Sequence, residues 1–113
     1  MLSLITVSFY FKVAQKDMRK RGYVYILASQ RNGTLYIGVT SNLTRRVWEH
    51  RNGIKSGFAT RYRTYLLVYY EEYQLVVDAI RREKQLKKWK RAWKVRLIES
   101  VNPLWCDLSE ELY

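Results

Sequence analysis

Apolar side chains gather along this chain in short runs that are separated by polar turns. Residues 23–28 are rich in β-branched and aromatic side chains, which predicts a strand. The polar segment 29–33 ends in Asn-Gly, a strong hairpin signal, so residues 34–39 should form an antiparallel partner strand. A third strand is expected over residues 65–70, ended by the acidic pair at 71–72.

Helical spacing of the apolar residues marks three further segments. Residues 43–51 follow a cap-forming Thr-Ser-Asn sequence and precede Asn-Gly, which predicts a helix. A second helix is expected over residues 76–88, and a third, or a bent continuation of the second, over residues 90–101 before Pro103. Residues 52–64 are interpreted as a basic loop.

The end of the chain should pack back onto the core. Trp93, Leu97 and Val101 recur at four-residue spacing, which predicts a core-facing stripe. Trp105 and Leu108 are expected to pack the following segment against the domain. Together the pattern indicates an α+β fold with a small three-stranded antiparallel sheet flanked by helices.

The length of 113 residues suits a single domain. We assign this domain to residues 21–108, with a C-terminal tail over 109–113. Residues 1–20 are interpreted as an N-terminal extension that is poorly ordered. Met18 opens a basic segment just before the first strand, and it is a candidate translation start.

The net charge of +11 makes polyanions natural partners, and nucleic acid is the commonest of them. Nine Lys or Arg residues and a single acid lie between Arg81 and Arg96, which predicts a surface that follows phosphates. The alternatives are a solvated face, or a cationic surface that serves solubility alone. The candidate nucleic-acid contacts are Lys55, Arg61, Arg63, Lys87, Lys88, Lys90 and Arg91.

Several chemical classes are disfavoured by the composition. Cys106 is the only cysteine and His50 the only histidine, so neither an intramolecular disulfide nor a usual four-ligand zinc site can form. No apolar run approaches the roughly 20 residues that span a bilayer. We therefore expect a cytoplasmic protein that does not enter a membrane.

Four residues of the predicted hairpin and first helix are candidates for phosphate chemistry. Tyr25 and Tyr36 lie on the paired strands, and Arg46 and His50 lie one helical turn apart. A tyrosine acts as a base near neutral pH only if its pKa is lowered, which we expect the surrounding cations to achieve. Arg46 would bind a phosphate, and His50 would position it or shuttle a proton. The alternatives are packing tyrosines and an ordinary surface histidine.

Glu83 is the only acid within the basic stretch, and its neighbours on the helix surface are apolar. Its carboxylate should therefore point toward the sheet, where it needs a partner. One possibility is Mg²⁺ or Mn²⁺, since magnesium is often held by one or two carboxylates together with water and phosphate oxygens. The other is an ion pair within the helix, with Arg81, Arg82 or Lys87.

These motifs together resemble those of the GIY-YIG nuclease superfamily, specifically its small single-domain bacterial branch. Tyr36-Ile37-Gly38 matches the second motif in full, while Val24-Tyr25 matches the end of the first, whose usual glycine is a tyrosine here. Residues 43–50 resemble the helix with the catalytic arginine, and residues 82–86 the metal-binding helix. Asn-Pro-Leu-Trp at 102–105 resembles the closing motif of the branch.

The resemblance, which covers residues 21–108, implies phosphodiester cleavage with one divalent metal. It assigns Tyr25 as the base or water-positioning group and Tyr36 as support for the nucleophile or phosphate. It assigns Arg46 to phosphate binding and Glu83 to the metal. His50 matches the histidine of the same helix, and Asn102 is a weaker match to a late asparagine.

We therefore expect a metal-dependent endonuclease that acts on DNA, with RNA as a further possible substrate, and that responds to structure or context rather than to a strict sequence. One alternative is a nucleic-acid-binding module that no longer cleaves. Another is an assembly protein whose basic helices dock an acidic partner. The sequence names no protein partner.

Overall fold

A computed structural model describes residues 20–54 and 57–112 of the chain. Three of the sequence-based expectations concern residues outside these ranges. They are the extension before residue 20, the candidate start at Met18, and the nucleic-acid contact at Lys55.

A three-stranded antiparallel sheet forms the centre of the molecule. Its strands are β1 (Gly22–Ala28), β2 (Leu35–Thr40) and β3 (Leu66–Tyr73), arranged in the order β2-β1-β3. Tyr25 on the central strand lies opposite Gly38 on β2 and opposite Tyr70 on β3. The expected α+β fold is thus confirmed, and β2 is an edge strand.

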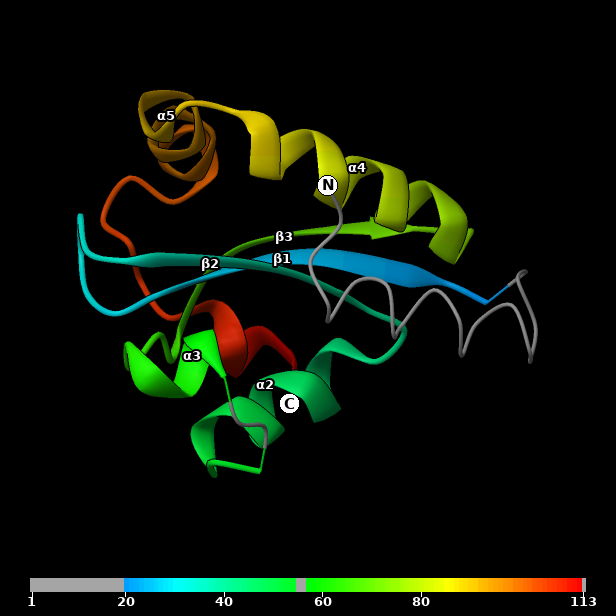
Figure 1. Ribbon diagram of the computed structural model, residues 1–113, viewed down its shortest axis with the longest axis horizontal. Coiled ribbons are helices and arrows are strands. Elements are labelled where there is room, and N and C mark those ends of the chain that lie inside the picture. Colours follow the sequence, from blue (N-terminus) through cyan, green and yellow to red (C-terminus); the bar gives the residue numbers. More distant parts are fainter. Residues whose placement is uncertain (1–19, 55–56, 113) are drawn as a thin grey trace.

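Helices cover both faces of this sheet (Figure 1). On one face lie α4 (Val76–Lys88) and α5 (Arg91–Val101). On the other lie α2 (Leu43–Arg51), α3 (Phe58–Arg61) and the 3-10 helix η1 (Leu108–Leu112). The short helix α3 corrects our interpretation of residues 52–64 as a loop without secondary structure.

Alternation along β1 divides the buried residues into two clusters. Val24 and Ile26 face the layer of α4 and α5, whereas Tyr25 and Leu27 face the layer of α2. Successive side chains of a strand point to opposite faces, so one strand supplies both clusters. The cluster on the α2 side contains both tyrosines that the sequence singled out, Tyr25 and Tyr36.

The helix boundaries follow local chemistry. Asn42 caps α2, because its side-chain oxygen accepts a hydrogen bond from the backbone N–H of Arg45 at 3.1 Å. Between α4 and α5, the backbone of Trp89 and Lys90 is extended, with ψ angles of 150° and 149°. These two residues therefore separate two helices rather than bend one.

Strand β3 runs further than the sequence predicted. It continues through the acidic pair to Tyr73, whereas we expected it to end at Tyr70. Glu71 tolerates this position because it accepts hydrogen bonds from Tyr69, Tyr73 and Arg82. The partners of Glu71 come from β3 itself and from α4, so this acidic residue does not end the strand.

The predicted core stripe of α5 holds at Leu97, which packs against the core, but is wrong at Trp93 and Val101, which are exposed. Ile98 is the buried residue of this helix. The reason is that α4 packs against β1, β2 and β3, while α5 packs mainly beside β3. A narrower part of α5 is buried as a result, and Trp93 faces outward.

The closing segment packs as expected. Trp105 is buried in the cluster under α4 and α5, and Leu108 packs against the cluster on the α2 side. Within the described residues, no helix has both the length and the apolar character needed to cross a membrane.

Candidate active site

The Tyr25 ring lies directly across the edge strand because residue 38 is a glycine. A Cβ atom added at Gly38 would come within 2.4 Å of both Cζ and Oη of Tyr25, which is closer than real atoms approach. Gly38 thus provides the space in which the phenol of the opposing residue is placed. This explains in physical terms why the second motif ends in glycine.

Three aromatic side chains from three elements meet around this phenol. The Tyr25 and Tyr36 ring centroids lie 6.2 Å apart, and the His50 ring lies 5.9 Å from Tyr25 and 5.4 Å from Tyr36. Tyr25 Oη and His50 Nε2 are 3.1 Å apart and hydrogen bonded. His50 is buried, so the alternative of an ordinary surface histidine is excluded.

The ionisation of the two phenols differs from our expectation. Burial raises the pKa of Tyr25 well above its usual value, repulsion between the two phenols in their ionised forms raises it further, and Arg46 lowers it only in part. Burial likewise raises the pKa of Tyr36, against a lowering by Arg46. The expected lowering of the tyrosine pKa is therefore wrong, because desolvation outweighs the nearby cation. Both phenols are protonated at neutral pH.

Arg46 is held beside the phenols by an acid of its own helix. Its Nε lies 3.2 Å from Oε1 of Glu49, one turn further along α2, and its side chain is largely buried. The positive charge of Arg46 acts on both phenols and lowers the pKa of each in part. A fixed guanidinium near two neutral phenols can bind and neutralise a phosphate.

Glu49 is a residue of this site that our sequence analysis missed. It is buried, and Nε of Arg45 lies 3.7 Å from its second oxygen. Its position three residues after Arg46 was a detectable signal, because residues at this spacing are neighbours on a helix. The ion pair with Glu49 fixes the orientation of the Arg46 guanidinium.

Glu83 lies on α4, in the layer opposite α2. Its side chain is only 1% exposed, and its negative charge raises the pKa of Tyr36. Tyr36 lies on the edge strand β2, so the charge of Glu83 acts on a phenol of the α2-side cluster. The sequence prediction that this carboxylate points toward the sheet is confirmed.

An ion pair within α4 also forms. Lys87 Nζ lies 3.4 Å from Oε1 of Glu83, whereas Arg81 pairs with Asp78 and Arg82 with Glu71. The carboxylate thus has one ammonium partner, and its donor chemistry suits a hard cation that takes its other ligands from water and phosphate. Among the described residues, no group of three or more His, Cys, Asp or Glu side chains is arranged to hold a metal. That Glu83 holds a divalent metal stays a prediction.

The predicted nucleic-acid contacts lie in both helical layers. Arg61 and Arg63 are exposed at the end of α3, and Lys88 and Lys90 are exposed at the junction of α4 and α5. Arg91 instead donates hydrogen bonds from Nη2 to the backbone oxygens of the β1–β2 turn, at 2.8 and 2.7 Å. Lys87 pairs with Glu83, so these last two cations also have partners within the fold.

Asn102 is placed in the scaffold rather than among the phenols. Its Nδ2 donates to the backbone oxygens of Val68 at 3.0 Å and Cys106 at 2.9 Å, and its Oδ1 accepts from the Cys106 N–H at 2.9 Å. The buried amide thus joins the end of α5 to β3 and to the closing segment. These bonds support a structural role for Asn102, and its assignment to the active site stays a prediction.

The chain is similar to known bacterial proteins. Among curated proteins, a UPF0213 protein of Clostridium perfringens is 37% identical over 80% of this chain and 91% of its own length. A UPF0213 protein of Staphylococcus haemolyticus is 35% identical over 68% and 93%, respectively. The solution NMR structure of the UPF0213 protein BH0048 from Bacillus halodurans is 27% identical, covers 73% of this chain and 86% of that chain, and has a TM-score of 0.47.

The family model that describes the GIY-YIG catalytic domain matches residues 21–96, a range that contains the phenols, Arg46, His50 and Glu83. This match covers more than half of the chain. The chain belongs to the GIY-YIG family, a family of nucleases.

Proposed function

We propose that this protein is a metal-dependent endonuclease that hydrolyses phosphodiester bonds in DNA. The observation that carries this proposal is the cluster of two phenols and an imidazole, together with a guanidinium and a buried carboxylate whose charges act on Tyr36. They come from β1, β2, α2 and α4. Tyrosines that serve packing alone need no charged neighbours. Here the charges of Arg46 and of the buried Glu83 both act on Tyr36, as is common at functional sites.

Arg46 binds the scissile phosphate in this mechanism. Its guanidinium opposes the negative charge that accumulates on the phosphate oxygens as water attacks phosphorus. Glu49 keeps the guanidinium in place through Nε, 3.2 Å away. Tyr36 carries a neutral O–H and donates a hydrogen bond to a phosphate oxygen or to the attacking water.

Tyr25 transfers a proton rather than acting as a phenolate. The attacking water gives its proton to Tyr25 Oη as the phenol gives its own proton to His50 Nε2, 3.1 Å away. Tyr25 thus ends the step neutral, as its raised pKa requires, and the imidazole carries the proton. Imidazole suits this role because histidine exchanges protons near neutral pH.

Glu83 would hold the divalent cation, which we propose to be Mg²⁺ or Mn²⁺. When bound, such a cation supplies positive charge at the phosphate and a bound water to protonate the leaving oxygen. Glu83 itself provides a buried, negatively charged ligand beside Tyr36. Lys87 balances the carboxylate when no other cation is present.

We propose that the protein selects its substrate by DNA structure or context. The exposed cations near the centre contact phosphates, which carry no sequence information. Arg61, Arg63, Lys88 and Lys90 are such cations. Reading a duplex sequence requires side chains that enter the grooves. The proposed function does not depend on such side chains.

Cleavage of supercoiled plasmid and branched DNA with Mg²⁺ or Mn²⁺ tests this function. We expect cleavage by the wild type and a loss of about 100-fold or more in Tyr25→Phe and in Glu83→Ala. Tyr23→Phe is a matched control, since Tyr23 lies on the same face of β1 and its hydroxyl contacts Glu72. Asp78→Asn is the control on α4, because it removes an exposed ion pair.

Two results would contradict the proposal. One is unchanged cleavage in both Tyr25→Phe and Glu83→Ala. The other is tight, metal-independent binding of DNA with no cleavage of any of these substrates by the wild type, which would favour a binding module that does not cut.

A further inference from the structure

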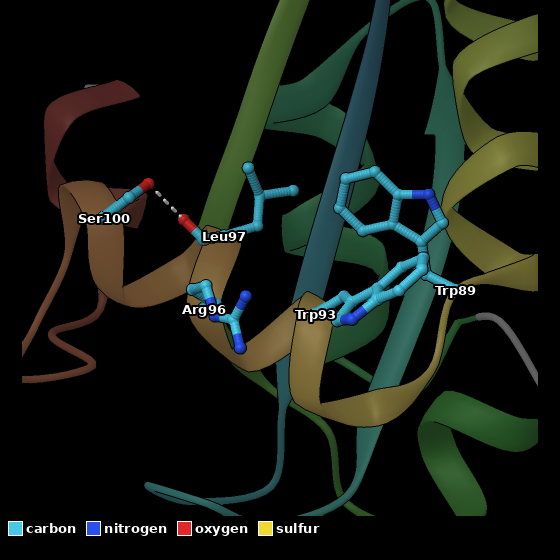
Figure 2. Close-up of a pocket in the computed structure, with 5 residues that line it drawn as sticks. All are labelled: Trp89, Trp93, Arg96, Leu97 and Ser100. Carbon is cyan, nitrogen blue, oxygen red and sulfur yellow. Dashed lines mark hydrogen bonds between the residues drawn. The ribbon is translucent and has the colours of Figure 1, made fainter.

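An open hollow of about 340 Å³ lies on the outer side of α5, apart from the residues of the catalytic proposal. It is lined by Trp89, Trp93, Arg96, Leu97 and Ser100 (Figure 2). Its volume falls within the range of about 300–1,000 Å³ that is common for small-molecule sites. Figure 2 shows two indole rings next to each other, with Arg96 on the same side of the helix.

The two indole side chains differ in how much of each ring is open to solvent. The Arg82 guanidinium lies over the Trp89 ring at 5.0 Å, and the Trp93 ring meets Trp89 nearly perpendicularly, with centroids 6.0 Å apart. Trp93 remains 48% exposed. A large aromatic side chain that is fixed at one edge and open to solvent on a face provides a stacking surface.

The electrostatics around this surface favour an anion. Lys90, Arg91, Lys94 and Arg96 lie within two turns, and Glu99, the acid of α5, accepts a hydrogen bond from the Trp105 indole at 2.8 Å. Burial and the repulsion of the positive Arg91 and Lys87 lower the pKa of Lys94. An anionic group nearby would relieve this repulsion.

We propose that the hollow binds an unpaired base of a DNA strand, which stacks on Trp93 while Arg96 contacts the adjacent phosphate. Charge complementarity and an open aromatic face are the two features that proteins combine to bind single strands. Trp93 and Arg96 lie three positions apart, so they are neighbours on the helix surface. Leu97, four positions after Trp93, forms the apolar floor.

This inference rests on the proposed function for its choice of DNA, and it specifies the substrate further. A paired base is stacked within the duplex and cannot place its face on an indole. Flaps, branches and single-stranded segments do expose such bases. The hollow would therefore favour DNA with an unpaired segment over uninterrupted duplex.

Binding without divalent metal tests the inference independently of cleavage. Fluorescence anisotropy measures how tightly the full chain binds a labelled 12-nucleotide oligo(dT) and a labelled duplex of equal length. Stacking of one base contributes about 5- to 150-fold in affinity. We expect Trp93→Ala to weaken oligo(dT) binding at least fivefold and to leave duplex binding within twofold, while Trp93→Phe retains most of the affinity.

Trp48→Ala is the matched control, because Trp48 is 51% exposed on α2, in the other layer, and does not line the hollow. It should change oligo(dT) binding less than twofold. Arg96→Gln should weaken binding and reduce the salt dependence by about one phosphate contact. Thermal unfolding monitored by circular dichroism verifies that each variant is folded.

Unchanged oligo(dT) binding in Trp93→Ala would overturn the inference, and so would an equal loss for oligo(dT) and duplex. Stronger, Trp93-dependent binding of oligo(U) would overturn the choice of DNA. Loss of self-association in Trp93→Ala at unchanged DNA affinity would assign the hollow to a second copy of the chain. Absence of cleavage by the wild type would contradict the proposed function alone.

Discussion

At the scale of single residues, burial decides the chemistry of the centre. Motif spacing and helix periodicity singled out Tyr25, Tyr36, Arg46 and Glu83 in the sequence, and in the structure the charges of Arg46 and Glu83 both act on Tyr36. Their joint role in catalysis stays a prediction. The sequence did not reveal the direction of the tyrosine pKa shifts. Those depend on how completely each phenol is removed from water, and this is a property of the packed fold.

Gly38 offers a test of how the Tyr25 phenol is placed. Gly38→Ala puts a Cβ atom 2.4 Å from Tyr25 Oη, so the ring must shift. We expect a loss of about 1–3 kcal/mol in the free energy of unfolding, measured with urea, together with a larger loss of cleavage. In a Tyr25→Ala background the same change should cost clearly less, since the clashing ring is gone. An equal cost in both backgrounds would refute the contact.

At the scale of elements, the sequence predicted every strand and every long helix, but not where contacts with other elements would override local signals. The acidic pair that seemed to end β3 is stabilised within the strand by residues of β3 and α4. The spacing of Trp93 and Val101 indicated a core stripe, yet α4 already covers the sheet there. In both cases a contact with α4 contributes, and local sequence signals do not contain such contacts.

Glu71 should make the stability of β3 and α4 dependent on pH. Burial alone would raise its pKa, but hydrogen bonds from Arg82, Tyr69 and Tyr73 outweigh burial and lower it below the usual 4.5. The ionised carboxylate therefore stabilises the fold above about pH 4.5, and this contribution is lost as the pH falls through the lowered pKa.

Chemical unfolding of wild type and Glu71→Gln between pH 7 and pH 3 measures this effect. The variant should be less stable at pH 7 and should lose less stability on acidification. Glu72→Gln, which removes the adjacent exposed acid, should keep the acid-induced loss of the wild type. The same acid-induced loss in Glu71→Gln would contradict this role.

Asn102 should act on stability and not on chemistry. Asn102→Ala removes bonds to Val68 and Cys106 and leaves buried backbone groups without partners, so we expect a loss of about 1–3 kcal/mol in the free energy of unfolding. The rate of DNA cleavage per folded molecule should stay within twofold of wild type. Ser100→Ala, at an exposed position of the same helix, should change stability by less than about 0.5 kcal/mol. A loss of cleavage without a loss of stability would return Asn102 to the active centre.

At the scale of the whole molecule, exposed positive charge lies in both helical layers. Arg61 and Arg63 lie at the end of α3 on one side of the sheet, and Lys88 and Lys90 lie at the junction of α4 and α5 on the other. The sequence predicted these cations as one class. It did not predict that they would lie on opposite sides of the sheet, which depends on the crossing of the chain from one face to the other.

We expect DNA to contact cations of both layers. The double variants Arg61→Gln/Arg63→Gln and Lys88→Gln/Lys90→Gln should each weaken binding and reduce the slope of log affinity against log salt by about two. Arg21→Gln, whose side chain pairs with Glu72 beside β3, should leave that slope unchanged. Fluorescence anisotropy over a salt series measures the slopes. An effect of one pair alone would confine DNA to a single layer.

The central claim is that Tyr25, which faces the α2 layer, and Glu83, which lies on α4 in the other layer, serve one reaction. The most direct measurement is the rate of DNA cleavage by Tyr25→Phe, Glu83→Gln and the double variant under identical Mg²⁺ or Mn²⁺ conditions. Residues that act as a unit are strongly non-additive, so the double variant should be no slower than about the slower single variant. Two losses that multiply in the double variant, or cleavage that survives both substitutions, would contradict a shared active centre.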